Sequence, residues 1–96
     1  MTKADIVKNI SDQTGVDKTD VQMIAEKFMD EIKNSLQNNN NVYLRGFGSF
    51  IIKTRAEKTG RNISKNTAVI IPAHNIPAFK PSKTFVKSVK QNVPIG

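Results

Sequence analysis

Cysteine is absent from this 96-residue chain. The absence excludes a disulfide framework and a cysteine-based zinc site, and a reducing compartment is the natural environment for such a protein. Asp5 and Lys8 interrupt the start of the chain, where a secretory signal would need an apolar segment. The longest apolar run, residues 68–73, is far shorter than the ~20 residues of a membrane span. We expect a cytoplasmic protein without a membrane partner.

Groups that could perform catalysis are also scarce. The chain has a single histidine, His74, and its one carboxylate beyond residue 41 is Glu57. The sequence contains no glycine-rich phosphate loop and no cluster of metal-ligating residues. A lone histidine of this kind is more often a surface residue than a catalyst. We therefore expect no enzymatic activity, no catalytic residue, no cofactor and no metal, and we assign His74 no role.

Acidic residues are nearly absent from the second half of the chain. Residues 1–41 hold five lysines and seven acidic residues, a net charge of −2, whereas residues 42–96 hold ten lysines and arginines and one acidic residue, a net charge of +9. A solvated lysine face usually includes acidic residues as well, so this ratio favours a surface that binds a polyanion. Nucleic acid is the favoured partner class, and RNA and an acidic protein remain alternatives.

The first half of the chain has the pattern of two helices. A capping-box sequence begins at Thr2, and Gly15 ends the first apolar stripe. A second N-cap sequence at Asp17 precedes apolar residues that recur at the 3.6-residue period from Val21 to Leu36. Acidic and basic residues mix on the opposite face, which favours ordinary packing over a membrane or cofactor. The asparagines at 38–41 mark the exit from the second helix.

From residue 42 the apolar period shortens to two, which indicates strands. Val42–Arg45 and Ser49–Arg55 alternate across a tight turn at Gly46–Gly48. Two further extended runs, Lys53–Lys58 and Thr67–Pro72, flank the polar turn "TGRNISKN" and predict a β-ribbon that projects from the sheet. The outer ribbon is too polar to pack and carries five cations, the composition of an arm that lies against phosphates: Lys53, Arg55, Lys58, Arg61 and Lys65.

The sequence therefore predicts one α+β domain over residues 1–96. A chain this short buries only roughly 60–70% of its unfolded surface when it folds alone, so a core shared between chains is plausible. A short C-terminal helix should present Lys83, Lys87 and Lys90 on its outer face. The expected units are helices in 1–41, a three-stranded antiparallel sheet in 42–81 with an arm at about 53–75, a helix at 82–91 and a tail without a role at 92–96.

Three segments, in this order and spacing, resemble the HU and integration host factor family of bacterial DNA-bending proteins. They are "RGFGSF" (45–50), "RAEKTGRN" (55–62) and "IPAFKPSK" (76–83), and the resemblance covers the chain from Thr2 to about Lys90. It implies an intertwined dimer, formed with a second copy or with a paralogue, whose helices support a saddle-shaped sheet and whose two arms wrap into the minor groove of double-stranded DNA.

The implied function is architectural and largely independent of sequence: the protein bends or compacts DNA in the nucleoid and prefers flexible or distorted DNA. A site-preferring bender of the integration host factor type is the alternative. The resemblance also implies a shared dimer core, for which we expect Phe28, Ile32, Leu44, Phe47, Phe50 and Phe79. We expect DNA contacts from Lys3, Arg45, Gly46, Gly48, Lys53, Arg55, Lys58, Arg61, Asn62, Ile63, Lys65, Lys80, Lys83 and Lys87.

Ile63 departs from the family pattern, because the family has a proline after "GRN" that inserts between base pairs. Isoleucine is among the apolar side chains that minor-groove proteins use to unstack a base step. An isolated aliphatic residue at the tip of a basic arm has base pairs as a natural partner. We therefore expect Ile63 to act as the DNA wedge, with a more movable side chain than proline has.

Overall fold

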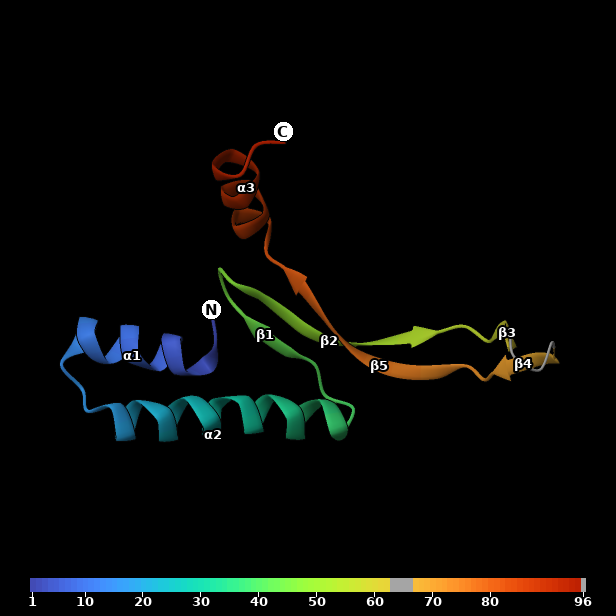
Figure 1. The fold of residues 1–96 in the computed structure, drawn as a ribbon, viewed down its shortest axis with the longest axis horizontal. Coiled ribbons are helices and arrows are strands. Elements are labelled where there is room, and N and C mark those ends of the chain that lie inside the picture. Colours follow the sequence, from blue (N-terminus) through green and yellow to red (C-terminus); the bar gives the residue numbers. More distant parts are fainter. Residues whose placement is uncertain (63–66, 96) are drawn as a thin grey trace.

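The computed structural model describes residues 1–62 and 67–95, with residues 61 and 62 described as strand backbone (Figure 1). The fold is of the predicted α+β class. Its elements are, in chain order, α1 (Lys3–Thr14), α2 (Lys18–Gln37), β1 (Val42–Leu44), β2 (Gly48–Arg55), β3 (Lys58–Asn62), β4 (Thr67–Ile71), β5 (His74–Pro81) and α3 (Lys83–Asn92).

The first helix begins and ends as the sequence predicts. The Thr2 hydroxyl accepts a hydrogen bond from the Asp5 N–H, and the Asp5 carboxylate accepts one from the Thr2 N–H at 2.9 Å. Gly15 takes the left-handed conformation with φ of 76°, and its N–H donates to the Ser11 carbonyl. Glycine adopts this conformation without the steric cost that a Cβ would add.

The second helix forms over the predicted range, but its predicted cap does not. Asp17 occupies the N-cap position of α2, yet its side chain makes no capping hydrogen bond. Helices α1 and α2 run side by side in Figure 1, and each contributes one of the buried hydrophobic residues of the described chain, Val7 and Val21. The apolar stripe of α2 is therefore covered by α1 at one end only.

Strands β1, β2 and β5 form the predicted three-stranded antiparallel sheet, in the order β1-β2-β5. Phe50 lies opposite both Val42 and Phe79, and Ser49 lies opposite both Tyr43 and Lys80. Successive residues of a strand point to opposite faces, so this register assigns every side chain of the sheet to one of two faces. The face of Phe50 is the one that meets α2, because Leu36 of α2 lines a common groove with Ile52 and Pro77.

Gly48 is buried where β2 begins. A Cβ at this position would lie 2.6 Å from both the carbonyl oxygen of Lys80 and the ring of Phe79. Real Cβ contacts are never this short, so only glycine lets β2 and β5 approach here. Gly48 thus has a packing role within this chain, and its predicted contact with DNA stays a prediction.

The arm has a longer paired region than the sequence suggested. Strand β3 pairs with β4 in antiparallel register from Lys58 opposite Ile71 to Asn62 opposite Thr67. Residues 59–62 are therefore strand rather than the turn that their polar composition predicted. The three-stranded sheet and the two-stranded ribbon are separated at residues 56–57 and 72–73, where Pro72 lacks the N–H that a ladder needs.

The last helix begins one residue later than expected. Pro81 is still part of β5, and Ser82 caps α3 by accepting a hydrogen bond from the Phe85 N–H at 3.2 Å. The Ser82 N–H donates to the Phe47 carbonyl, which joins α3 to the turn between β1 and β2. The rings of Phe47 and Phe79, and those of Phe50 and Phe79, have centroids 5.0 Å apart and continue this link into the sheet.

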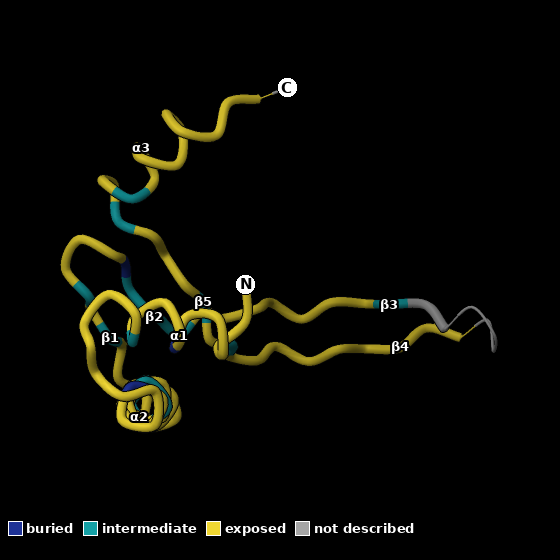
Figure 2. Tube along the Cα trace, turned by 60° about the vertical axis from the view of Figure 1, so that its left-hand side comes forward, coloured by how far each residue is buried: buried dark blue, intermediate teal, exposed yellow. Residues whose placement is uncertain are grey.

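Very little of this chain is buried, as Figure 2 shows by the long exposed stretches in both helices and the arm. Phe28 is 52% exposed and Phe79 is 39% exposed, although both belong to the predicted core. Ile32, Leu44 and Phe50 are half-buried. Apolar residues of α1 and α2, among them Ile6, Ile24 and Met29, also line an open groove. A single copy of the chain thus leaves its helical and aromatic surfaces uncovered.

Candidate nucleic-acid interface

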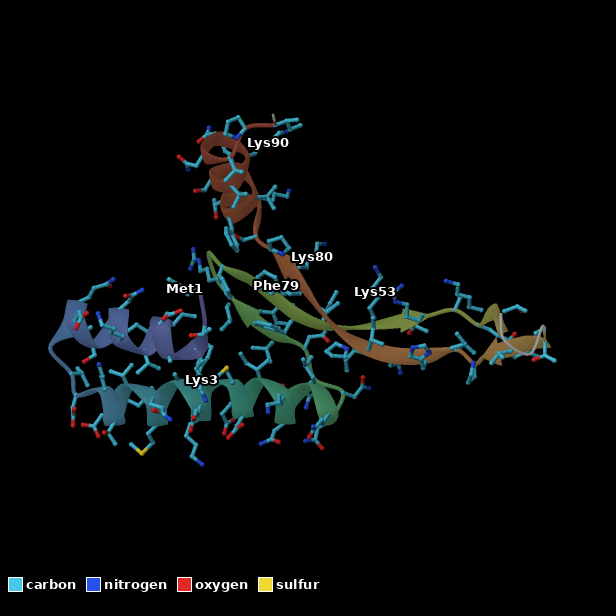
Figure 3. All side chains as sticks on the ribbon, in the orientation of Figure 1. Met1, Lys3, Lys53, Phe79, Lys80 and Lys90 are labelled. Carbon is cyan, nitrogen blue, oxygen red and sulfur yellow. The ribbon has the colours of Figure 1, made fainter. Side chains whose placement is uncertain are left out.

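One face of the three-stranded sheet carries the cations. Lys53 and Arg55 of β2 share a face with Ser49, and Lys80 of β5 joins them because it lies opposite Ser49. All three cations are exposed, and Figure 3 shows Lys53 and Lys80 on the side of the sheet away from α2. We call this the cationic face: Tyr43, Ser49, Ile51, Lys53, Arg55, His74, Ile76, Ala78 and Lys80.

The other face of the same sheet is apolar or uncharged. Phe50, Ile52 and Phe79 lie on it, and Thr54 donates a hydrogen bond to Asn75 there at 2.8 Å. The alternation of β2 therefore separates a packing face from a charged one. No carboxylate lies on either strand pair of the sheet, since Glu57 comes after β2 ends. The cationic face is thus open to an anionic partner.

The arm continues this positive surface beyond the sheet. Lys58 is exposed on β3 and lies opposite Ile71 of β4. The side chains of Arg61 and Asn62, and the whole of Ile63 and Lys65, lie outside the described residues. The predicted wedge at Ile63 and the phosphate contacts of these neighbours therefore stay predictions from the sequence.

A shallow groove lies where the turn between β1 and β2 meets the start of α3. Arg45, Lys80 and Lys83 line it together with Tyr43. Gly46 makes the turn with φ of 82°, a conformation that favours glycine. Three cations around one groove favour an anionic occupant. Lys87 and Lys90 extend the positive surface along exposed positions of α3.

Lys3 is the exception among the predicted contacts. Its ammonium lies 2.7 Å from a carboxylate oxygen of Glu26, which also accepts a hydrogen bond from the Gln22 amide. The hydrogen bond from Lys3 and that from Gln22 lower the pKa of Glu26 below its ordinary value. Figure 3 places Lys3 beside α2, far from Lys53 and Lys80. Within one chain Lys3 is therefore paired in the helical half, away from the cationic face, and its predicted contact with DNA stays a prediction.

Tyr43 and His74 are polar ring residues of the cationic face that carried no predicted role. Tyr43 lies at the centre of β1 and opposite Ser49, and His74 lies opposite Arg55. His74 Nδ1 is 2.9 Å from the Pro72 carbonyl oxygen, so this nitrogen carries the proton and donates it. The alternation of residues 42–44 indicates that the Tyr43 side chain lies on the face of the sheet opposite to Val42 and Leu44. The position of His74 opposite Arg55 could not be predicted from the sequence, because it depends on the strand register.

Among the described residues, no group of three or more histidine, cysteine or acidic side chains could hold a metal ion. None of the helices in the described part of the chain is long and apolar enough to cross a membrane. The fold and the cationic face define a small basic α+β protein with a two-stranded arm.

Comparison with known proteins agrees with this class. The family model for bacterial DNA-binding proteins matches residues 1–90, and the chain belongs to that family, as its resemblance to HU and integration host factor predicted. The DNA-binding protein HU of Thermus thermophilus is 35% identical over 91 residues, which cover 95% of this chain and 94% of that protein. Integration host factor subunit beta of Marinobacter nauticus is 36% identical over 97 residues, covering 100% of this chain and 99% of that protein.

A solved structure is similar over nearly the whole fold. The Anabaena HU–DNA cocrystal structure matches with a TM-score of 0.89 at 30% sequence identity, and the match covers 94% of this chain and 98% of that chain. The helices, the three-stranded sheet and the arm therefore occur together in a relative that has been crystallised with DNA.

Proposed function

We propose that this protein is an architectural DNA-binding protein that holds double-stranded DNA against its cationic face and wraps arms along the minor groove. The observation that carries the proposal is the separation of charge across one sheet: exposed Lys53, Arg55 and Lys80 share a face that has no carboxylate. We propose DNA as the polyanion that binds there, because relatives of this chain are named DNA-binding proteins and one was crystallised with DNA. No catalytic role is proposed.

The active form is a dimer, and its second copy covers the apolar surface that one chain leaves exposed. Phe28, Phe47 and Phe79 are too exposed in a single chain to form a stable core, and the groove between α1 and α2 is open. The predicted core set fits this surface: Phe28, Ile32, Leu44, Phe47, Phe50 and Phe79. A second identical copy or a paralogue can supply the partner surface, since some relatives are named as alpha and beta subunits.

Within this dimer the helical half forms the base, the sheets form the saddle and the ribbons form two arms. Bending a site of 20–30 base pairs costs of order 1–6 kcal/mol, which phosphate contacts and apolar burial must offset. The proposed DNA contacts are Arg45, Gly46, Lys53, Arg55, Lys58, Arg61, Asn62, Lys65, Lys80, Lys83 and Lys87. Lys3 and Gly48 belong to the proposed set as well, since the ion pair of Lys3 with Glu26 joins two exposed side chains and is weak.

Ile63 is the proposed wedge. It follows Asn62 at the end of β3, so it lies near the tip of the arm in sequence. Its aliphatic side chain can enter a base step and unstack it, at a cost of a few kcal/mol per step. The minor groove distinguishes little beyond A·T from G·C, so this mode of binding favours flexible or distorted DNA over a particular sequence.

Site-preferring binding of the integration host factor type is a second candidate. It rests on the similar identity of this chain to an HU protein, 35%, and to an integration host factor subunit, 36%. Either function places the protein on the nucleoid, within the cytoplasm.

Fluorescence anisotropy with labelled duplexes tests the proposal. We expect nanomolar to micromolar binding to intact duplex at low salt, tighter binding to nicked duplex, and affinity that falls steeply as salt rises. Similar affinity for several unrelated sequences supports the architectural function, whereas one strongly preferred site supports the second candidate. Preference for an RNA duplex or an acidic protein over DNA would overturn both.

A further inference from the structure

Tyr43 is the least explained side chain of the cationic face. It is 72% exposed at the centre of β1, whereas Phe47, Phe50, Phe79 and Phe85 gather in an aromatic cluster. The register aligns Tyr43, Ser49 and Lys80 in one row across the three strands. Single exposed aromatic residues are common on protein surfaces, so exposure alone assigns no role. The hydrogen bonds around the phenol are more informative.

The side chain of Asn41 donates a hydrogen bond to the Tyr43 hydroxyl oxygen. The side-chain oxygen of Asn41, Oδ1, accepts a hydrogen bond from the Ile52 backbone N–H at 3.1 Å, just beyond the point where β1 stops pairing with β2. Its amide nitrogen is then turned toward Tyr43 and donates to the phenol oxygen at 3.4 Å. Since the phenol oxygen already accepts this bond, its own proton is left to donate elsewhere. No acceptor for that proton is found among the described residues.

Tyr43 lines a groove that can attract an anion with acceptor oxygens for this proton. Arg45, Lys80 and Lys83 line the groove with Tyr43, and no carboxylate is among the lining residues. An anion drawn in by these three cations brings oxygen acceptors close to Tyr43, whose hydroxyl still has a proton to donate. DNA on the cationic face carries such oxygens on every phosphate.

We propose that the Tyr43 hydroxyl, oriented by Asn41, donates a hydrogen bond to a phosphate oxygen of DNA seated on the cationic face. The assignment rests on the proposed DNA-binding function and adds a contact of a different physical kind. A lysine contact releases condensed counterions from DNA and so weakens as salt rises. A neutral hydroxyl displaces no counterion, and its contribution to affinity should be the same at every salt concentration.

This difference separates the Tyr43 contact from its cationic neighbours. Tyr43→Phe should weaken binding to intact duplex by roughly three- to tenfold, the range for the removal of one hydrogen bond, with an unchanged slope of log affinity against log salt. Lys80→Ala should lower the magnitude of that slope by about 0.9 for each phosphate that the lysine neutralises. Thr54→Val is the matched control, because it removes a hydroxyl from the opposite face of the sheet and should leave DNA affinity unchanged.

The outcomes also separate this inference from the proposed function. Failure of the unaltered protein to bind duplex would remove the proposed function itself. Normal binding by the unaltered protein together with unchanged affinity of Tyr43→Phe, in a variant that melts normally, would overturn the Tyr43 contact alone. A Tyr43→Phe variant that bound more weakly through a smaller salt slope would also overturn it, because the loss of affinity would then be electrostatic.

A second measurement uses the unaltered chain and does not depend on how a variant folds. Tyr43 is the one tyrosine of the sequence, and tryptophan is absent, so chemical nitration reports on this residue. Saturating duplex should slow the nitration of Tyr43 at least severalfold, and added salt that releases the DNA should restore the original rate. An equal rate in free and DNA-saturated protein would contradict the proposed contact.

Discussion

The helical half and the basic half of the chain differ in how many of their lysines form ion pairs. In residues 1–41 the ion pairs are Lys3–Glu26, Lys8–Asp12 and Lys33–Asp30, all between exposed side chains. Within the described part of residues 42–96 no ion pair is formed, and Glu57 is the one acidic residue there. Three of the five lysines in residues 1–41 are therefore paired locally, whereas no lysine in the described part of residues 42–96 is. We expect the lysines of the basic half, which have no carboxylate beside them, to contribute most to DNA binding.

The two halves agree in a second property, which is uncovered apolar surface. Phe28 in α2 and Phe79 in β5 are both substantially exposed, and the ring of Phe79 lies against those of Phe47 and Phe50 near the junction with α3. A sheet with one charged face and one apolar face is stable only when the apolar face packs against another surface and is removed from water. Dimerisation and DNA binding are thus two consequences of one alternating pattern in β2 and β5.

Loss of the aromatic junction should have the largest effect on stability. Phe79→Ala should lower the free energy of unfolding by about 3–5 kcal/mol, because it empties a site that touches Phe47 and Phe50. Urea unfolding followed by circular dichroism measures the change. Tyr43→Phe, on the other face, is the control and should unfold at nearly the same urea concentration as the unaltered protein. Equal stability of Phe79→Ala and the unaltered protein would show that the junction is no part of a core.

Melting should also depend on protein concentration. If the second copy covers the helices and the aromatic junction, the melting temperature rises as the protein is concentrated, since association stabilises the folded state by mass action. Differential scanning calorimetry over a hundredfold range of concentration detects this shift. A constant melting temperature for a species that sediments as a monomer would contradict the dimer.

Ile63 should affect bending more than binding. Ile63→Ala removes the proposed wedge but keeps every cation of the arm, so the bend of an intact duplex, measured by energy transfer between its ends, should decrease. Affinity should fall severalfold on intact duplex and less on nicked duplex, where unstacking has already occurred. Ile63→Pro should restore or exceed the original bend. An unchanged bend after Ile63→Ala would remove the wedge.

The smallest effect is expected at the Lys3–Glu26 pair. The pKa of Glu26 is lowered in the folded protein by the hydrogen bonds from Lys3 and Gln22. A lowered folded-state pKa stabilises the protein above the unfolded pKa, and the contribution is lost as the pH falls through the folded pKa. Glu26→Gln should therefore melt slightly lower than the unaltered protein at neutral pH, with the difference vanishing in acid. A difference that grew as the pH fell would contradict the pairing.

Local sequence signals predict much of this fold, whereas pairings between distant residues are hidden from them. The capping box at Thr2 and the left-handed Gly15 involve neighbours a few residues apart, so the sequence displays both partners. The ion pair of Lys3 joins residues 23 positions apart, and no pattern within α1 indicates it. The polar composition of residues 59–62 predicts a turn, but these residues form a strand. A two-stranded ribbon that projects into solvent can form without alternating apolar residues.

The candidate site shows the same division. Composition and spacing identify the cations, but the register is needed to show that Lys53, Arg55 and Lys80 share one face. The glycines that border the turn suggest a sharp bend or a close approach of the backbone, whereas the packing of Gly48 against Lys80 and Phe79 depends on β5, a strand far along the chain. No role was predicted for Tyr43. It lies in one row with Ser49 and Lys80, and Lys80 is far from it in sequence, so the row is visible only from the strand register.

The most direct test compares the salt dependence of DNA affinity for two triple variants that each remove three positive charges. Arg55→Ala with Lys58→Ala and Arg61→Ala alters the arm, and Lys8→Ala with Lys27→Ala and Lys33→Ala alters the helical half. The arm variant should bind every duplex at least about a hundredfold more weakly, with a salt slope smaller by about 0.9 per phosphate no longer neutralised, while the helical variant keeps the original slope. Equal reductions of slope in the two variants would show that net charge, and not the cations of the sheet and arm, determines binding.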